Sequence, residues 1–174
     1  MWDTFVLWMV PSAIALHNLE EALWLPAWSE ARTGRPIGEF AFRFAVVILT
    51  AVSIAIAIFA QLGGHSSLGF YLLAACALGQ SINIFVPHLA ATIATRTYAP
   101  GLASGLIFVL PASGVFLINF FSIPDFGLRR FLIVSAIFIP LMVLSIPVLL
   151  GAGQMIEKKG ILKSANQPDA GVGK

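Results

Sequence analysis

The chain has 174 residues, of which 59% are apolar and 10% are charged, with a net charge of +2. A soluble domain carries about 25% charged residues, so 10 basic and 8 acidic side chains are too few to cover a water-facing surface. The single cysteine, Cys76, excludes a disulfide framework and paired-cysteine metal motifs. The basic residues are scattered and form no stripe with interleaved aromatic residues, which excludes a nucleic-acid partner.

Long stretches without charge indicate helices that span a membrane. They cover residues 44–95, 97–124 and 131–156. A span needs about 20 predominantly apolar residues, so the first stretch holds two spans and the others hold one each. Another apolar segment precedes them. The sequence therefore predicts an all-α integral membrane bundle of five transmembrane helices embedded in a lipid bilayer. Their predicted ranges are about 4–27, 41–61, 68–92, 101–122 and 131–153.

The predicted breaks between these helices have recognisable chemistry. Gly63-Gly64-His65-Ser66-Ser67 predicts a short turn with a serine that can cap the helix after it. Tyr98-Ala99-Pro100-Gly101 predicts a tight corner. Residues 1–153 are expected to form a single domain. Residues 154–174 are polar and rich in Gly, Ala and Lys, so they are predicted to be a disordered cytoplasmic tail.

The distribution of Lys and Arg predicts the orientation, because positively charged loops stay in the cytoplasm. One set of loops carries only Arg129 and Arg130. We therefore expect the N-terminus outside and the C-terminus in the cytoplasm, in the plasma membrane or the inner membrane of a prokaryote. The other set of loops carries the remaining basic residues: Arg32, Arg35, Arg43, Arg96, Lys158, Lys159, Lys163 and Lys174.

Two of the predicted spans carry ionisable side chains at membrane depth, where such groups are costly and indicate function. His17, Glu20 and Glu21 are spaced i, i+3 and i+4, so they share one face of the first helix. Asn83 and His88 lie at a similar depth on the third helix. The sequence predicts that the two faces form one polar cluster in the cytoplasmic half of the bilayer.

Imidazole and carboxylate groups together can bind a divalent transition metal such as zinc or iron. The expected ligands are His17, Glu20 and His88, with Glu21 as the general base that activates water. This arrangement predicts a metal-dependent hydrolase acting on a lipid or other membrane-soluble substrate. Three nearby polar residues are expected to bind that substrate, with an anionic head group at the cytoplasmic rim: Asn83, Arg96 and Tyr98.

A proline and a pair of glycines lie close to the expected cluster. Pro87 removes the backbone hydrogen bond to the carbonyl of Asn83 and predicts a kink. The kink either shapes the site or is one of the prolines that membrane helices ordinarily tolerate. Gly101-x-x-x-Gly105 is typical of close helix packing within one chain, with a dimer interface as the alternative.

Two other functions remain open. The carboxylates and His17 suit a proton relay, as in an ion- or proton-coupled transporter or another ligand-binding membrane protein. Together with His88 and Arg96, the same residues can instead form a buried, charge-paired network in a structural subunit without chemistry.

The chain resembles the HXXEE family of small multi-pass membrane proteins. His17-Asn18-Leu19-Glu20-Glu21 matches the motif that names the family. A second motif follows in the expected order, with Asn83, His88 and Arg96-Thr97-Tyr98-Ala99-Pro100-Gly101. The resemblance extends from about Leu7 to Leu150. It implies that both motifs belong to one site, and it implies no substrate or cofactor.

Overall fold

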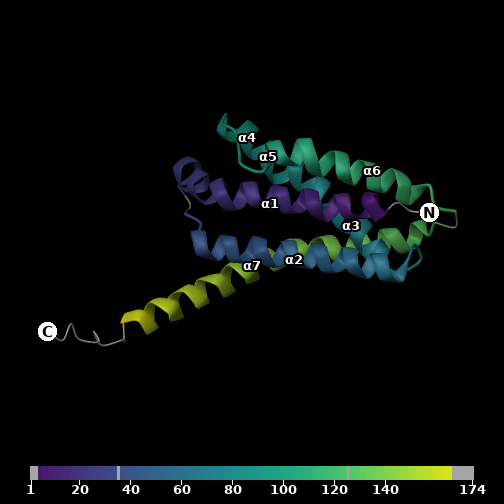
Figure 1. Cartoon of the computed structure of the whole chain (residues 1–174). Coiled ribbons are helices and arrows are strands. Elements are labelled where there is room, and N and C mark those ends of the chain that lie inside the picture. The colour runs from purple at the N-terminus through teal and green to yellow at the C-terminus, as the bar shows by residue number, and fades with distance from the viewer. Residues whose placement is uncertain (1–3, 35, 125, 166–174) are drawn as a thin grey trace.

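The computed structural model describes residues 4–34, 36–124 and 126–165. Within these residues every regular element is helical, which confirms the all-α prediction. Two of the five helical rods contain short segments assigned as π-helix, η1 and η2. Figure 1 shows how the rods are arranged. The elements are α1 (Thr4–Thr33), α2 (Glu39–Gly63), α3 (Leu68–Asn83), η1 (Ile84–Leu89), α4 (Ala90–Thr95), α5 (Leu102–Ser104), η2 (Gly105–Val109), α6 (Leu110–Phe121) and α7 (Leu128–Ala165).

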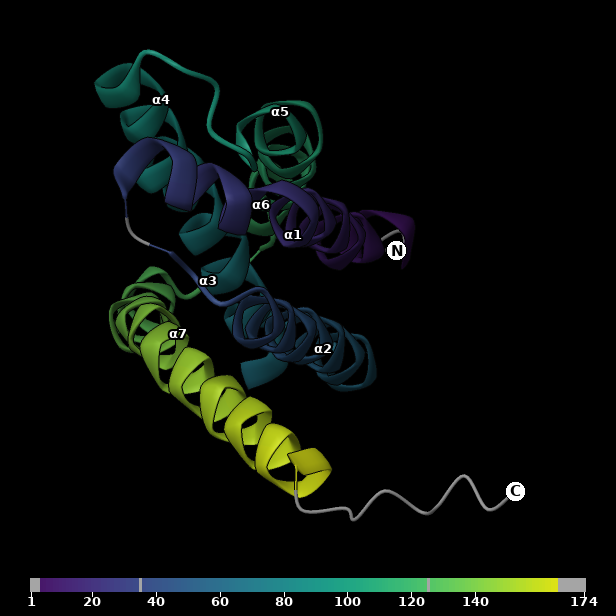
Figure 2. The ribbon, with the colours of Figure 1, turned by 90° about the vertical axis from the view of Figure 1, so that its left-hand side faces the viewer.

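Helix α3 is the centre of the bundle. It packs against α2, α6 and α7, while α1 lies on α2 and on the η2–α6 rod (Figure 2). The α3–α4 rod is the most buried of the apolar rods and α7 is the least buried. This arrangement places the polar face of α1 near the end of the α3 rod and the start of the α5 rod.

In the part of the chain that the structure describes, four rods are long and apolar enough to cross a membrane: Glu39–Gly63, Leu68–Thr95, Leu102–Phe121 and Leu128–Gly160. Helix α1 is not among these four, although its 30 residues provide sufficient length. The polar residues between His17 and Glu21 interrupt the apolar character of α1. The helix with the least apolar span is therefore the one that carries the predicted site.

The helix ends agree with the predicted breaks at one end of the bundle and differ at the C-terminus. The Ser67 hydroxyl accepts a hydrogen bond from the Phe70 amide at 3.2 Å, which confirms the predicted cap. Helix α7 continues to Ala165, so residues 154–165 are helical and the prediction of a disordered tail is wrong for them. The remainder of the predicted tail, 166–174, lies outside the described residues. A helix that has already formed adds further residues at little cost, even where their composition is polar.

The end of the bundle that holds the α2–α3 turn is packed with aromatic rings. We call Phe70, Phe116, Phe120, Phe126 and Phe131 the phenylalanine cluster. The Phe120 ring is central, because its centroid lies 5.4 Å from those of Phe70 and Phe131 and 5.2 Å from that of Phe126. Its side chain is 1% exposed. This cluster joins α3, α6 and α7 far from the polar face of α1.

Candidate functional site

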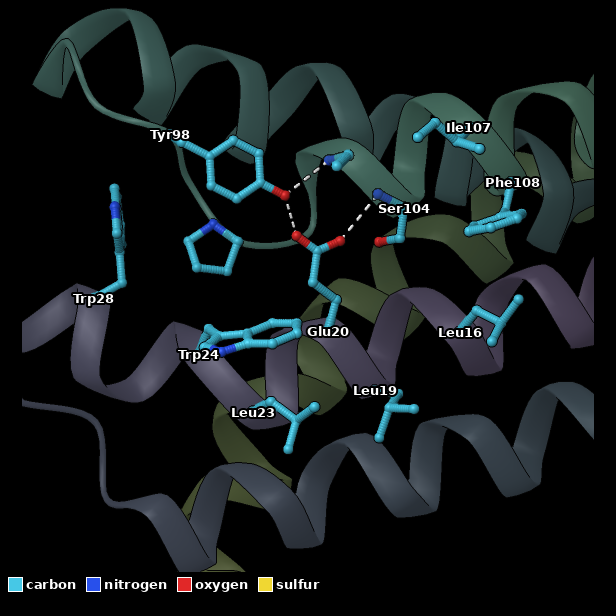
Figure 3. Close-up of a pocket in the computed structure, with 12 residues that line it drawn as sticks. Leu16, Leu19, Glu20, Leu23, Trp24, Trp28, Tyr98, Ser104, Ile107 and Phe108 are labelled. Atoms are coloured by element: carbon cyan, nitrogen blue, oxygen red, sulfur yellow. Dashed lines mark hydrogen bonds between the residues drawn. The ribbon is translucent and has the colours of Figure 1, made fainter.

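The two adjacent glutamates of α1 face different surroundings, because successive residues on a helix diverge by about 100°. Glu20 points toward the start of the α5 rod, where its Oε2 accepts a hydrogen bond from the Ser104 amide at 2.9 Å. The Tyr98 hydroxyl donates to the other oxygen of Glu20 (Figure 3). The Ala103 amide donates in turn to the Tyr98 hydroxyl at 3.1 Å. Glu20 thereby fastens α1 to the corner that precedes α5.

Tyr98 lies in the turn between α4 and α5. Burial, and then the hydrogen bond to Glu20, raise the pKa of Tyr98 to about 12. The phenol therefore remains protonated, and remains a donor to Glu20, throughout the physiological pH range. The stabilisation that follows from this raised pKa is present below pH 10 and is lost as the pH rises through about 12.

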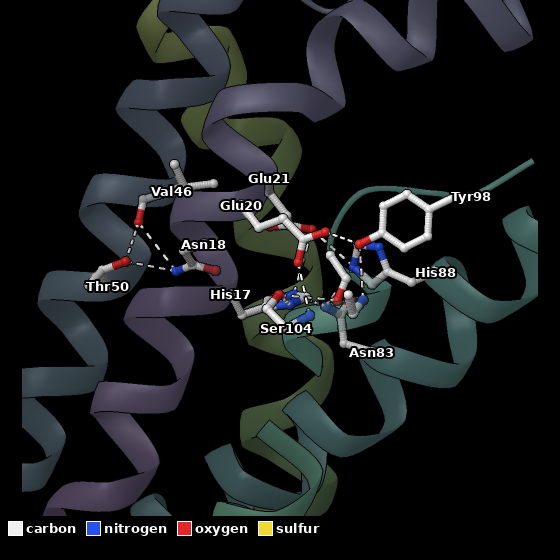
Figure 4. A network of polar contacts seen from close by, with 12 residues as sticks. His17, Asn18, Glu20, Glu21, Val46, Thr50, Asn83, His88, Tyr98 and Ser104 are labelled. Atoms are coloured by element: carbon white, nitrogen blue, oxygen red, sulfur yellow. Dashed lines mark hydrogen bonds and ion pairs between the residues drawn. The ribbon is translucent and has the colours of Figure 1, made fainter. Parts of the chain in front are cut away.

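Glu21 faces the two histidines instead. Its Oε1 lies 2.9 Å from Nε2 of His88 and 3.7 Å from Nε2 of His17 (Figure 4). The imidazole rings meet edge to face, with centroids 5.0 Å apart. His17 and His88 are 0% and 2% exposed, so both rings are held inside the bundle. This contact confirms the prediction that the polar faces of the first and third helices form one cluster.

The kink within η1 brings Asn83 and His88 together. Residues five apart on a continuous α-helix lie about 140° apart and could not meet on one face. The chain leaves helical geometry at Val86, with φ −136° and ψ 106°, directly before Pro87. Asn83 Nδ2 consequently lies 3.3 Å from Nε2 of His88 and 3.4 Å from Nε2 of His17. The irregular geometry predicted at Pro87 is therefore confirmed, and it shapes the cluster.

Gly101 closes the cluster from the side of the α4–α5 turn. Its φ of +95° lies in the left-handed region that only glycine adopts readily. A Cβ atom at this position would lie 2.5 Å from the His88 ring and 2.9 Å from the His17 ring. The backbone can approach both imidazoles only because residue 101 has no side chain. Further along, a Cβ at Gly105 would overlap Ile84, so this glycine spacing serves packing within the chain.

The structure arranges the predicted site residues differently from the expected ligand set. His17, Glu21 and His88 present one ligand atom each, and these atoms lie within 4.8 Å of one another. Glu21 thus takes the place beside the histidines that was expected of Glu20, because Glu20 is held by Tyr98 and Ser104. The carboxylate beside the two histidines is therefore that of Glu21.

Asn83 and Tyr98, two of the three residues expected to bind substrate, lie in or beside the cluster, and Arg96 does not. Arg96 is exposed at the end of α4, with φ +52°. It forms no ion pair or side-chain hydrogen bond with the part of the chain that the structure describes. Its role in binding an anionic head group remains a prediction.

Ser104 belongs to the site although the sequence does not single it out. Its hydroxyl lies 3.2 Å from Nδ1 of His17, and its amide binds Glu20. Serine is common in membrane helices, so the residue type alone does not indicate a site. The one sequence feature that could have identified Ser104 is its position one turn after Gly101 on the same rod.

Asn18, within the first motif, has a structural contact. Its side-chain amide donates to the Thr50 hydroxyl at 2.7 Å and thereby joins α1 to α2 (Figure 4). The second residue of the motif therefore fixes the rotation of α1, which decides where Glu20 and Glu21 point.

Two cavities meet α1 at these glutamates. An inner cavity of about 270 Å³ lies among α1, α2, α3 and α7 and is lined by Glu21 and Asn83 among mostly apolar residues. A larger groove of about 810 Å³ lies between α1 and the α5–η2 stretch and is lined by Glu20, Tyr98 and Ser104 at its polar part. Glu21 therefore faces the inner cavity and Glu20 faces the groove.

Comparison with known proteins agrees with the resemblance carried by these residues. Residues 8–116 match the model of a family described as proteins of unknown function with an HXXEE motif. The chain is 31% identical over 147 residues to the uncharacterized protein YrkK of Bacillus subtilis (strain 168), which covers 83% of this chain and 92% of that protein. No solved structure matches the chain. Both motifs of the resemblance contribute residues to the cluster or to its edge, and the chain belongs to the HXXEE family.

Proposed function

We propose that this chain is a metal-dependent hydrolase of the membrane, in which His17, Glu21 and His88 bind a divalent transition metal such as zinc or iron. The observation that carries the proposal is the convergence of two imidazole Nε2 atoms and one carboxylate oxygen inside the bundle. Two histidines and one glutamate form a known ligand set of catalytic zinc sites, with the fourth position open to water or substrate.

The dimensions of the cluster suit such an ion. At metal–ligand distances of about 2.0–2.1 Å, tetrahedral ligand atoms lie about 3.3 Å apart. The separations of Glu21 Oε1 from the two Nε2 atoms, 2.9 Å and 3.7 Å, bracket this value. His17 also has the outer contact that metal-binding histidines usually make, from Nδ1 to the Ser104 hydroxyl.

The inner cavity supports a role in hydrolysis. A metal bound there would polarise a substrate carbonyl or phosphoryl group and activate water. Glu21 lines this cavity, and a carboxylate has a second oxygen that can accept a proton from that water. Asn83 lines the same cavity, and its amide can orient the substrate. The mostly apolar lining favours a lipid or another membrane-soluble substrate.

We further propose that all five rods cross the membrane, with the N-terminus outside and the C-terminus in the cytoplasm. The excess of Lys and Arg in one set of loops supports this orientation. Single cysteines test it, because the native Cys76 is buried. Ser66→Cys should react with a membrane-impermeant maleimide from outside, and Ser164→Cys should react only after the membrane is opened. The reverse pattern would contradict the orientation.

The metal site is tested by elemental mass spectrometry on detergent-purified full-length protein, prepared without chelators. We expect about one equivalent of a transition metal per chain, lost in His17→Ala and in His88→Ala. His65→Ala is the matched control, because His65 is exposed in the α2–α3 turn and should leave the metal content unchanged. Circular dichroism shows whether each variant keeps its helices.

Activity is then measured on ester-, amide- and phosphodiester-linked lipids, with and without the metal restored. We expect turnover that requires both the metal and His88. A protein that carries no metal, and takes up none when zinc or iron is supplied, would eliminate the metallohydrolase.

Proton-coupled transport is a second candidate, favoured by one contact. Asn83 Nδ2 lies within hydrogen-bond distance of both histidine Nε2 atoms, so the cluster can close as a hydrogen-bonded network beside Glu21 without a metal. Such a network suits proton transfer. Proton-coupled flux in liposomes that is abolished by Glu21→Gln would favour the transporter over the hydrolase.

A further inference from the structure

The large groove on the outside of the bundle has features of a second binding site. Its volume is about 810 Å³, and Glu20 is the single charged side chain among its twelve lining residues. Figure 3 shows Trp24 and Tyr98 on one side of Glu20 and an apolar stretch on the other. That stretch includes Leu16, Ile107 and Phe108.

The Glu20 carboxylate has neutral partners only. It accepts a hydrogen bond from the Tyr98 hydroxyl and one from the Ser104 amide, and the Ser104 hydroxyl and the Gly101 backbone lie beside it as well. No Lys, Arg or His of the described residues forms an ion pair with it. A negative charge beside apolar walls without a cation is complementary to a positively charged ligand.

The aromatic residues of the groove favour the same charge. Trp24 lies one helical turn after Glu20, and Tyr98 contacts Glu20 directly. Aromatic faces attract a ligand ammonium group, and more strongly where water is excluded. The Trp28 Nε1 atom is buried without a hydrogen-bond partner among the described residues. An acceptor atom of the ligand, next to its ammonium group, could accept a hydrogen bond from this N–H group.

The dimensions of the groove indicate a tail attached to that head group. The lining residues of α1 extend from Leu16 to Trp28, which is about 18 Å along a helix. The stretch beyond Glu20 offers only apolar side chains, and Ile107 is 63% exposed there. Beyond Glu20 the groove is therefore lined by apolar side chains, and a hydrocarbon chain can fill it.

We infer that this groove binds an amphiphile with an ammonium head group, placed between Glu20 and Trp24, with its hydrocarbon tail along Leu16, Ile107 and Phe108. The inference does not depend on the metal centre, because His17, Glu21 and His88 do not line the groove. A His88→Ala protein without metal should still bind the amphiphile, so the two proposals fail separately.

The test uses full-length protein in uncharged maltoside micelles with radiolabelled hexadecylamine as the probe. Hexadecanol and hexadecanoate, which share its tail, serve as competitors. We expect saturable binding of the amine, with the alcohol and the acid competing about tenfold more weakly, because a charge-assisted contact contributes at least that factor. Glu20→Gln should weaken amine binding about tenfold and remove the preference over hexadecanol. Glu30→Gln, at an exposed position of the same helix, is the control and should change nothing.

A second pair of variants keeps the inference testable if Glu20→Gln fails to fold. Ile107→Trp enlarges a side chain that lines the groove, and Ile118→Trp does so at a similarly exposed position outside it. Only the first should reduce hexadecylamine binding, by about tenfold. Equal affinity for the amine and the alcohol, or amine binding unchanged in both Glu20→Gln and Ile107→Trp, would overturn the inference.

Discussion

The two ends of the bundle bury their interiors in opposite ways. At one end, the phenylalanine cluster joins α3, α6 and α7 through aromatic rings that need no polar partner. At the other end, His17, Glu21, His88 and Asn83 are enclosed with their polar atoms in mutual contact. Loss of one ring at the aromatic end leaves no buried polar atom without a partner, whereas loss of one polar side chain at the other end does. We conclude that the aromatic end mainly stabilises the fold, and that the polar end fixes the positions of the site residues.

The largest effect on stability is expected at the aromatic end. Phe120→Ala removes the central, 1% exposed ring of the phenylalanine cluster. Loss of apolar contacts and the resulting cavity should lower the free energy of unfolding by about 3–5 kcal/mol. Reversible unfolding in mixed micelles measures this change. Phe59→Ala, at a ring that is 50% exposed and lies outside the phenylalanine cluster, is the control and should have a small effect. Loss of metal from folded Phe120→Ala protein would contradict the separation of the two ends.

A smaller change in stability, but a larger change in the site, is expected at Gly101. In Gly101→Ala, the added methyl group meets both imidazole rings, and the backbone keeps a φ unfavourable for alanine. We expect a loss of about 2 kcal/mol in the free energy of unfolding, together with loss of the bound metal. Gly114→Ala is the control, because nothing lies within 4 Å of its Cβ position. A Gly101→Ala protein with normal metal content would show that the turn does not position the histidines.

The smallest effect is expected at the corner that holds Glu20. Tyr98→Phe removes the hydroxyl that donates to Glu20 and accepts from the Ala103 amide. The free energy of unfolding should fall by about 1 kcal/mol, the value of an ordinary hydrogen bond. Thermal unfolding and metal content are measured on the same sample. The metal content should stay unchanged, because Tyr98 contacts Glu20 and not the cluster. Loss of the metal from Tyr98→Phe would show that the groove and the cluster act as one site.

The fold was largely predictable because charge and apolar length are local properties of a membrane sequence. The uncharged stretches predicted the rods α2, α3–α4, α5–α6 and α7 near their observed positions. The length of α7 was not predictable from composition, because residues 154–165 are polar yet continue an existing helix. The interruption at Pro87 was predictable, since proline removes a specific backbone hydrogen bond.

The membership of the polar cluster was predictable, and the division of labour between its carboxylates was not. Spacing along α1 placed Glu20 and Glu21 on one broad face. Which of them meets His88 depends on the rotation of α1 against α2 and on the corner at Tyr98. Both are tertiary contacts between residues far apart in the chain. Ser104 was missed for the same reason, because its importance arises only when α5 lies against His17.

The π-helical segment η1 has a consequence for how related sequences are aligned. The chain leaves helical geometry at Val86, so Asn83 stands before the kink and His88 after it. In a continuous α-helix two residues five apart would lie about 140° apart and could not meet on one face. A relative that keeps both motifs but lacks the kink would therefore hold its asparagine and histidine on different faces, so alignments of the family should be checked at the kink as well as at the motifs.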